Sequence, residues 1–306
     1  MRALLVTDLE GVHGADAVDC LIGGEAAWQG ARLRATHEVN LAIVGLSKQG
    51  FTEFIVSDSH RNGTEEPNLV LSALDPRARH DFRDDAFDRR LFSGVSAVAA
   101  LGMHAAGGVP GFISHALDVG LAWELDGRFI SETDFLLDLC AAAMTPFLFV
   151  TGDDALVHSL PPGTASVTTK RVLTSTTAQS LPLQEVEEAL LHAALAPPRP
   201  AAPLPEGPLR LHVKSKSFEV PDLPFLERES DFTVLVRGDS ARERYEHALV
   251  AVSAASSTTA EFVDGSPGDP TFVAQVERLL AAPWPSLQRP RNAATDGLEP
   301  VKPTSS

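Results

Sequence analysis

Over the first 155 residues, short apolar runs that end in polar residues alternate with longer stretches whose apolar residues recur at helical intervals. The longest such stretch, residues 25–49, is followed by Gly50, and glycine is common just after a helix ends. The apolar runs predict strands at 2–7, 53–57, 97–102 and 146–151. Because a helix separates the first two strands, they form a βαβ crossover, which is typical of a parallel sheet. We therefore expect an α/β fold, with a mainly parallel sheet and helices on both of its faces.

Residues 121–130 have a different pattern, in which two short strand-like runs flank Asp126-Gly127. This dipeptide favours the type I′ turn of a β-hairpin, because both of its residues tolerate positive φ. Ser131 follows as the N-cap of a second helix, with Asp134 forming a partial capping box. We expect this helix to end near residue 144.

From about residue 160 the pattern changes to strands and helices that are separated by a proline-rich break at 197–208. The strands and helices expected here are 164–174, 183–196, 209–217, 232–238, 240–255 and 269–282. The change predicts an α/β domain over residues 1–158 and a smaller α+β lobe over 159–284. The remainder, 285–306, is rich in Pro, Ser and Thr and is expected to be a disordered tail.

Composition and charge narrow the function classes. With 44% apolar and 22% charged residues, the 306-residue chain has ordinary globular usage. Its formal net charge of -16 repels phosphate backbones and anionic lipids, so we expect neither nucleic acid nor membrane as a partner. Asp8 and Glu10 interrupt the N-terminal apolar run, which argues against a signal peptide and for a cytoplasmic protein. Cys20 and Cys140 are expected to be free thiols in apolar surroundings.

Acidic and imidazole side chains follow three of the predicted strands where each strand ends: Asp8 and Glu10, Asp58 and His60, and His104. The carboxyl ends of parallel strands share one edge of a sheet, and α/β folds place their ligands there. We therefore expect these side chains to converge. His115, in a Gly- and Pro-rich loop, and Glu132, at the start of the second helix, reach the same edge if the loop folds back.

Carboxylates and imidazoles without a thiolate are a natural shell for zinc or a similar divalent ion. A catalytic zinc uses about three protein ligands, so five are too many for one ion. Two ions that share a bridging carboxylate fit better. Two ions roughly 3.5–4 Å apart would polarise a scissile carbonyl and lower the pKa of a water from about 15.7 toward about 7. The residues alone therefore favour a metal hydrolase.

Taken singly, each of these residues has a plainer explanation. Asp8 or Asp58 could simply cap the turn that follows its strand. Asp153-Asp154 also follow a strand, and capping of the next helix is the preferred interpretation for them. Three further histidines do not follow strands and are expected to be structural or solvated, namely His13, His37 and His80.

Six short segments carry a resemblance to a known family: TDLEGVHG (7–14), VSDSHRN (56–62), LGMHA (101–105), GVPGFISHALD (108–118), SE (131–132) and VTGDD (150–154). In order and separation they resemble the bacterial D-aminopeptidases of the dipeptide-transport operon type. The likeness extends from residue 1 to about 180, including VTTKRVLTSTTAQSL at 167–181. The proline-rich insertion from about residue 200 and the tail have no match in that family.

The resemblance implies a two-zinc aminopeptidase. Asp8 matches the bridging carboxylate, Glu10 and His60 complete the shell of one ion, and His104 and Glu132 complete that of the other. The match at Glu132 is short, and if the alignment slips there, Glu124 or Asp134 is the nearest rival ligand.

The resemblance also implies a catalytic role for His115, which we expect to transfer a proton as general base or acid near the activated water. The implied substrates are short peptides or amides with a free N-terminal D-amino acid. Members of the family assemble as decamers of two stacked five-membered rings, so the resemblance implies a homodecamer.

Two other functions are compatible with the same residues. A phosphoesterase can use the same ion pair, but the sequence has no Lys/Arg cluster near the motifs and no glycine loop to cradle phosphate. A non-catalytic member of the same fold is the second alternative. A non-catalytic protein would not need an intact set of metal ligands together with His115, so the presence of all six residues argues against this alternative.

Overall fold

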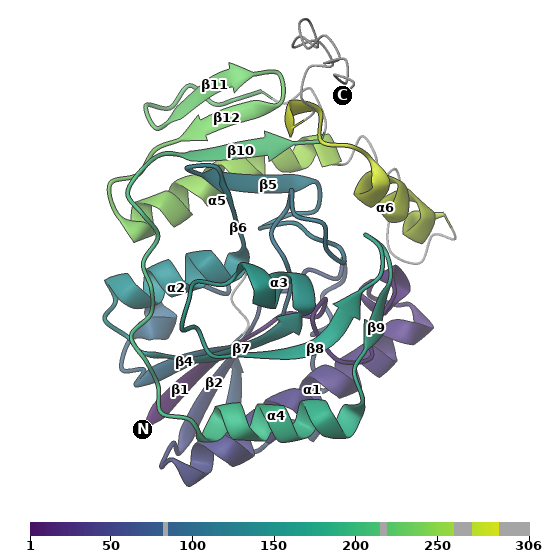
Figure 1. Cartoon of the computed structure of the whole chain (residues 1–306), viewed down its shortest axis with the longest axis vertical. Helices are drawn as coiled ribbons and strands as arrows, with labels where there is room; N and C mark the ends of the chain where they lie inside the picture. The colour runs from purple at the N-terminus through teal and green to yellow at the C-terminus, as the bar shows by residue number, and fades with distance from the viewer. Residues whose placement is uncertain (82–84, 215–218, 260–270, 288–306) are drawn as a thin grey trace, which may run out of the picture.

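The computed structural model of the chain describes residues 1–81, 85–214, 219–259 and 271–287. Figure 1 shows two β-sheets, one above the other, with helices between and around them. Helices α2 (Glu132–Ala142) and α5 (Ala241–Thr259) lie between the two sheets and pack against each other. The lower sheet contains the ends of the strands that carry the predicted site.

The lower sheet has seven strands in the order β3-β2-β1-β4-β7-β8-β9. All neighbouring strands are parallel except β8 and β9, which are antiparallel. The four strands predicted in the first 155 residues are all present, as β1, β2, β4 and β7. The strands are β1 (Arg2–Thr7), β2 (Glu53–Asp58), β3 (Ala78–Asp81), β4 (Ala97–Met103), β7 (Phe147–Asp153), β8 (Ser166–Val172) and β9 (Ala178–Ser180).

Helices cover both faces of this sheet. Along β1, Leu4 and Val6 join the apolar core that includes α2, whereas Ala3 and Leu5 join the core that includes α1 (Ala26–Lys48). A second helix, α4 (Leu183–Leu195), packs beside α1, and α3 (Asp154–Ser159) packs on β8. Strands that are buried on both faces read as continuous apolar runs, which is why the sequence pattern located them. The predicted α/β fold with helices on both faces is confirmed.

The upper sheet has five antiparallel strands in the order β11-β12-β10-β5-β6. Asp126 and Gly127 join β5 to β6 with φ values of 50° and 81°, so the predicted hairpin turn with two positive φ angles is confirmed. The predicted strand at 209–217 ends at Val213, and its residues 215–217 lie outside the described residues. The strands are β5 (Leu121–Leu125), β6 (Arg128–Ile130), β10 (Leu209–Val213), β11 (Leu226–Ser230) and β12 (Thr233–Val236).

The remaining elements are short or peripheral. Helix α6 (Phe272–Ala281) falls within the predicted helix 269–282, whose first two residues lie outside the described residues. The described ranges also contain four 3-10 turns: η1 (Val18–Cys20), η2 (Leu71–Ala73), η3 (Arg89–Phe92) and η4 (Pro285–Leu287). No helix in the described part of the chain combines the length and the apolar character needed to cross a bilayer. Both cysteines are free thiols, Cys140 being buried and Cys20 half-buried.

The two sheets exchange segments along the chain. The lower sheet includes β8 and β9, which follow residue 158, and α4 packs on this sheet. The upper sheet includes the β5-β6 hairpin, which precedes residue 158. The predicted division into 1–158 and 159–284 stays a prediction. Of the predicted tail at 285–306, residues 288–306 lie outside the described residues.

Candidate metal centre

The structure brings together all six residues of the predicted metal and catalytic site. Asp8 and Glu10 follow β1, His60 follows β2 and His104 follows β4, so four side chains reach the carboxyl edge of the lower sheet. The other two arrive from the loop before β5 and from the first turn of α2. Their possible ligand atoms form three groups, each within 4.8 Å: Asp8, Glu10 and His60; Asp8, His104 and Glu132; Glu10, His104 and His115.

Two glycines allow the loop after β1 to cross the end of β4 at close range. The amide of Gly11 donates to the carbonyl of Gly102 at 2.7 Å, and a Cβ on Gly11 would lie 1.9 Å from the Met103 carbonyl oxygen. Gly102 itself has a φ of +72°, and a Cβ there would lie 2.2 Å from the carbonyl oxygen of Asp8. Only glycine fits such an approach, so these two positions set where the Asp8 carboxylate is held.

Asp8 lies at the middle of the cluster, with one carboxylate oxygen directed to each side. Its Oδ1 is 3.3 Å from Nδ1 of His60, and its Oδ2 is 3.4 Å from Nε2 of His104. On one side Glu10 Oε2 lies 3.0 Å from the same His60 nitrogen, and on the other Glu132 Oε1 lies 3.8 Å from the same His104 nitrogen. Two three-ligand groups therefore share one carboxylate.

Backbone carbonyls fix the orientation of the three imidazoles. The ring nitrogens that face away from the cluster bond to carbonyl oxygens: His60 Nε2 to Leu21 (2.8 Å), His104 Nδ1 to Ala105 (3.0 Å) and His115 Nδ1 to Ile113 (2.7 Å). A carbonyl only accepts, so each of these nitrogens carries a proton, and in the neutral imidazole the opposite nitrogen has the lone pair. Among the residues that the structure describes, the buried Nε2 of His104 has no hydrogen-bond partner. Such orientation is typical of histidines that bind a metal.

The cluster strongly favours positive charge at its centre. Burial lowers the pKa of His104, but Asp8 and the neighbouring carboxylates outweigh burial and raise that pKa to about 10. Burial likewise lowers the pKa of His60, and Glu10 and Asp8 raise it well above its ordinary value. A divalent cation between the nitrogens and carboxylates meets the same electrostatic demand as those protons.

The pKa values of the carboxylates are shifted by the same burial and the same neighbouring charges. Burial raises the pKa of Asp8, but the neighbouring imidazoles of His104 and His60 outweigh burial and hold that pKa well below the ordinary value. Burial and the nearby Asp8 charge raise the pKa of Glu132 to about 7. Several buried acids share this small volume, and donors of this chemistry, without sulfur, fit zinc.

Glu132 is the acid of its region that reaches the cluster. It opens α2, and its Oε1 accepts a hydrogen bond from the Leu117 amide at 2.8 Å. The two rival ligands have other partners: Glu124 pairs with His212 at 3.1 Å, and Asp134 completes the capping box with Ser131 and bonds Arg128. Of these three acids, only Glu132 belongs to one of the possible metal-binding groups of the described residues.

Two aspartates at strand ends have the capping roles that the sequence suggested. Asp153 caps α3 by accepting from the Leu156 amide at 2.7 Å, as predicted. Asp58 accepts from the backbone amides of His60 (3.2 Å) and Asn68 (2.9 Å), and so supports the loop that carries His60. The three histidines that were expected to be structural or solvated, His13, His37 and His80, lie outside the possible metal-binding groups of the described residues.

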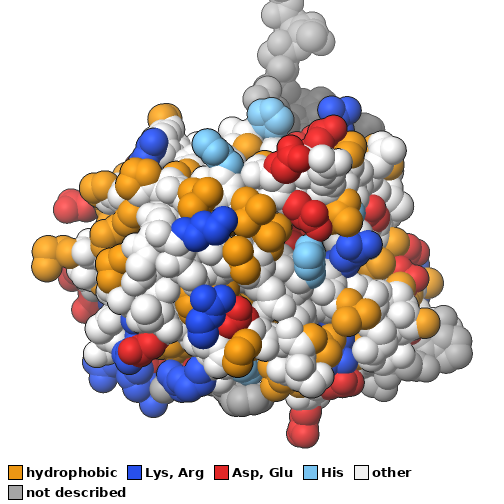
Figure 2. Space-filling view, turned by 90° about the horizontal axis from the view of Figure 1, so that it is seen from below, with side chains coloured by type: hydrophobic (Ala, Val, Ile, Leu, Met, Phe, Trp, Pro, Cys, Tyr) orange, Lys and Arg blue, Asp and Glu red, His pale blue; other side chains and the backbone are white. Residues whose placement is uncertain are grey.

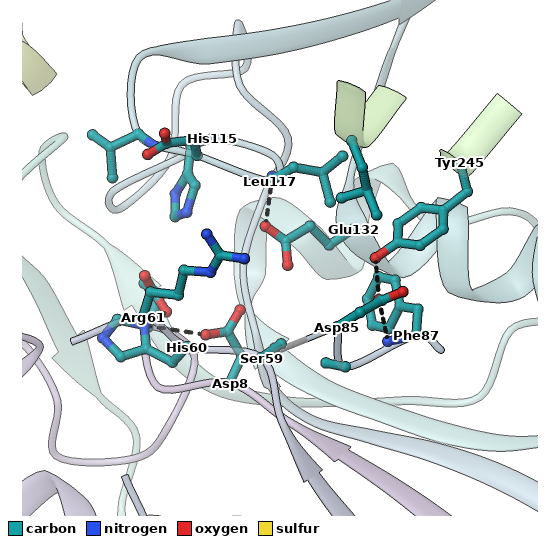
Figure 3. Close-up of a pocket in the computed structure, with 15 residues that line it drawn as sticks. Asp8, Ser59, His60, Arg61, Asp85, Phe87, His115, Leu117, Glu132 and Tyr245 are labelled. Carbon is teal, nitrogen blue, oxygen red and sulfur yellow. Dashed lines mark hydrogen bonds and ion pairs between the residues drawn. The ribbon is translucent and has the colours of Figure 1, made fainter. Parts of the chain in front are cut away.

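His115 stacks on His104, with ring centroids 4.2 Å apart and planes 15° apart. Burial and the neighbouring His104 lower its pKa. The backbone around it is strained, because the non-glycine residues Ile113 and Leu117 have φ values of 47° and 69°. Figure 3 shows the ring extending into the cavity beside the cluster.

The sequence did not predict the other walls of this cavity, which has a volume of about 240 Å³. Tyr245, from α5, donates to Asp85 Oδ1 at 2.7 Å, and the Phe87 amide donates to the same oxygen at 2.9 Å (Figure 3). Arg61 also lines the cavity, directly after His60 in the chain. Of these four residues, only Arg61 lies within one of the short segments that carry the family resemblance, VSDSHRN.

Carboxylates and imidazoles gathered at the carboxyl edge of a parallel sheet define a candidate metal centre of the hydrolase type. A family model described as D-aminopeptidase matches residues 1–250, and the chain belongs to this peptidase family. The resemblance drawn from the short segments is thereby confirmed.

Two comparisons with individual proteins agree with this membership. The D-aminopeptidase of Bacillus subtilis (strain 168) is 26% identical over 181 residues, which are 56% of this chain and 63% of that protein's length. A solved structure of the Zn-dependent D-aminopeptidase DppA from Bacillus subtilis, described as a self-compartmentalizing protease, superposes with a TM-score of 0.71. At 22% identity, covering 84% of this chain and 98% of that one, it shows the same fold.

Proposed function

We propose that this protein is a zinc-dependent aminopeptidase that hydrolyses short peptides or amides with a free N-terminal D-amino acid. The observation that carries the proposal is the position of Asp8, whose two oxygens face His60 on one side and His104 on the other. Membership of the D-aminopeptidase family supports the class of reaction.

The proposed centre takes two zinc ions. Asp8 would be the ligand that both share, Glu10 and His60 would complete one set of ligands, and His104 and Glu132 would complete the other. Zinc in such a site polarises the scissile carbonyl and makes a water nucleophilic at neutral pH. Because His60 and His104 each donate one ring N–H to a backbone carbonyl, the opposite ring nitrogen would be the one available to a bound ion.

His115 is the proposed catalytic residue. Its Nδ1 is bound to the Ile113 carbonyl, which leaves Nε2 to accept a proton in the cavity and to deliver it to the leaving amine. Stacking on His104 fixes the ring plane beside the ligands. Asp85 and Asp118 are wall carboxylates outside the proposed ligand set, and their charge favours a substrate that carries an ammonium group.

The cavity also suits a short substrate. Its volume of about 240 Å³ is below the range of about 300–1,000 Å³ that is usual for drug-sized ligands. We further propose that the chain forms a homodecamer, as the resemblance implied. The description of DppA as self-compartmentalizing supports assembly. Light scattering of the purified protein measures this directly, and a monomer would contradict it.

Parallel assays on the zinc-loaded protein test the function. D-alanyl-D-alanine should be hydrolysed, and its all-L counterpart and an aryl phosphate should be poor substrates. Turnover of the phosphate alone would identify a phosphoesterase. Full zinc content without turnover of any of the three would identify a non-catalytic protein.

A further inference from the structure

Arg61 is the only lysine or arginine among the described residues that line the cavity beside the candidate metal centre. The other ionisable side chains of the walls are five carboxylates, two imidazoles and the Tyr245 phenol. Two bound divalent cations would offset most of that negative charge. The guanidinium is always protonated, so it is then available for an anionic group of the ligand.

The backbone that carries Arg61 is fixed on both sides. The ring of His60 donates to the Leu21 carbonyl at 2.8 Å, and the Gly23 amide donates to the carbonyl of Asn62 at 2.9 Å. The Asn62 side chain is only 5% exposed. The backbone of Arg61 is therefore held on both sides by its neighbours, which places the base of its side chain beside the candidate metal centre.

The side chain of Arg61 is exposed and lies in the cavity. Figure 3 shows it extending between Asp8 on one side and His115 and Glu132 on the other. Within the described part of the chain its guanidinium has no hydrogen-bond or ion-pair partner. By contrast, Arg32 and Arg77 are each paired with an acid. An unpaired cation beside a reaction centre can bind a ligand without first breaking an ion pair.

We propose that Arg61 binds the C-terminal carboxylate of the substrate and so selects dipeptides over longer peptides and over amides. The inference rests on the proposed aminopeptidase function and names its substrate class. A guanidinium matches a carboxylate with two parallel N–H donors, which gives both affinity and orientation.

The size of the site supports this assignment. In a dipeptide the carboxylate lies one residue beyond the scissile bond, a step of about 3.3–3.6 Å along an extended chain. A cavity of about 240 Å³ that also contains the metal ligands must hold that carboxylate close to the reacting carbonyl. Each extra residue moves the carboxylate away by a further step, and it then loses the contact with Arg61.

A binding experiment tests the assignment independently of turnover. Two analogues of D-alanyl-D-alanine, with CH2–NH in place of the scissile amide, end in a carboxylate or in a carboxamide. Titration calorimetry measures both Kd values for the zinc-loaded wild type, Arg61→Gln and Arg61→Lys. Arg79→Gln is the matched control, because Arg79 is exposed on β3 and lies outside the lining of this cavity.

The wild type should bind the carboxylate analogue about 10- to 100-fold more tightly than the carboxamide, as expected for a charged hydrogen-bonded pair. Arg61→Gln should bring this ratio close to one, Arg61→Lys should give an intermediate ratio, and Arg79→Gln should keep the wild-type ratio. An unchanged ratio in Arg61→Gln, or a wild type with no preference or no binding, overturns the role of Arg61. Binding with the expected ratios but no hydrolysis of D-alanyl-D-alanine overturns the proposed function instead.

Discussion

The buried ion pair between Arg244 of α5 and Asp138 of α2 should be essential for joining the upper layer to the helix that carries Glu132. Nη2 of Arg244 lies 2.6 Å from Oδ2 of Asp138, and the two side chains are only 7% and 3% exposed, respectively. Arg244→Met leaves the Asp138 carboxylate buried without its cation, which costs about 3–5 kcal/mol. With an unfolding entropy of about 2.1 cal/mol/K per residue over 306 residues, this corresponds to a fall in Tm of about 5–8 °C.

Differential scanning calorimetry of a double-mutant cycle measures the interaction. Asp138→Asn keeps the oxygen that accepts from the Leu204 amide at 3.0 Å, so it removes the charge but not that hydrogen bond. The double variant has no unpaired charge, and it should be more stable than the sum of the single changes by about 2–3 kcal/mol. Strict additivity of the two single changes would refute the reasoning, because it would mean that the two charges do not interact.

Three further predictions concern the site. His115→Ala should keep the wild-type zinc content while kcat on D-alanyl-D-alanine falls about 10²- to 10⁴-fold, and a wild-type rate would contradict the catalytic role. Zinc affinity, measured against a chromogenic chelator, should weaken from about pH 8 to about pH 6, because the raised pKa values of His60 and His104 mean that protons compete for the ligand nitrogens below those values. An affinity independent of pH would exclude these imidazoles as ligands. Gly102→Ala should lower both Tm and zinc affinity, because alanine at a φ of +72° costs about 1–2 kcal/mol and its Cβ meets the Asp8 carbonyl. Unchanged zinc affinity would show that the close approach of the loop after β1 to the end of β4 does not position Asp8.

The part of the site that the sequence predicted is the part built from strand ends. Continuous apolar runs located β1, β2 and β4, and the rule that parallel strands share a carboxyl edge placed Asp8 and His104 side by side. The geometry there follows from backbone direction alone. For His115 and Glu132 the pattern gave only the loop and the helix start, and the resemblance supplied their expected roles.

The walls of the cavity could not be predicted in the same way. Tyr245 reaches Asp85 across 160 positions of sequence, and that contact depends on how α5 packs on α2. The β5-β6 hairpin shows the same limit, because Asp126-Gly127 encodes the turn but not the sheet that the hairpin joins. Local turn chemistry is a property of neighbouring residues, whereas sheet membership depends on pairing with the distant β10.

The zinc content of the purified protein tests the central claim most directly. After zinc loading and gel filtration, elemental analysis by mass spectrometry should give two equivalents per chain for the wild type. Asp8→Asn should lose both, because the Asp8 carboxylate faces both ligand groups. A wild type without tightly bound zinc, or an Asp8→Asn variant that keeps two equivalents, would contradict a two-ion centre built around Asp8.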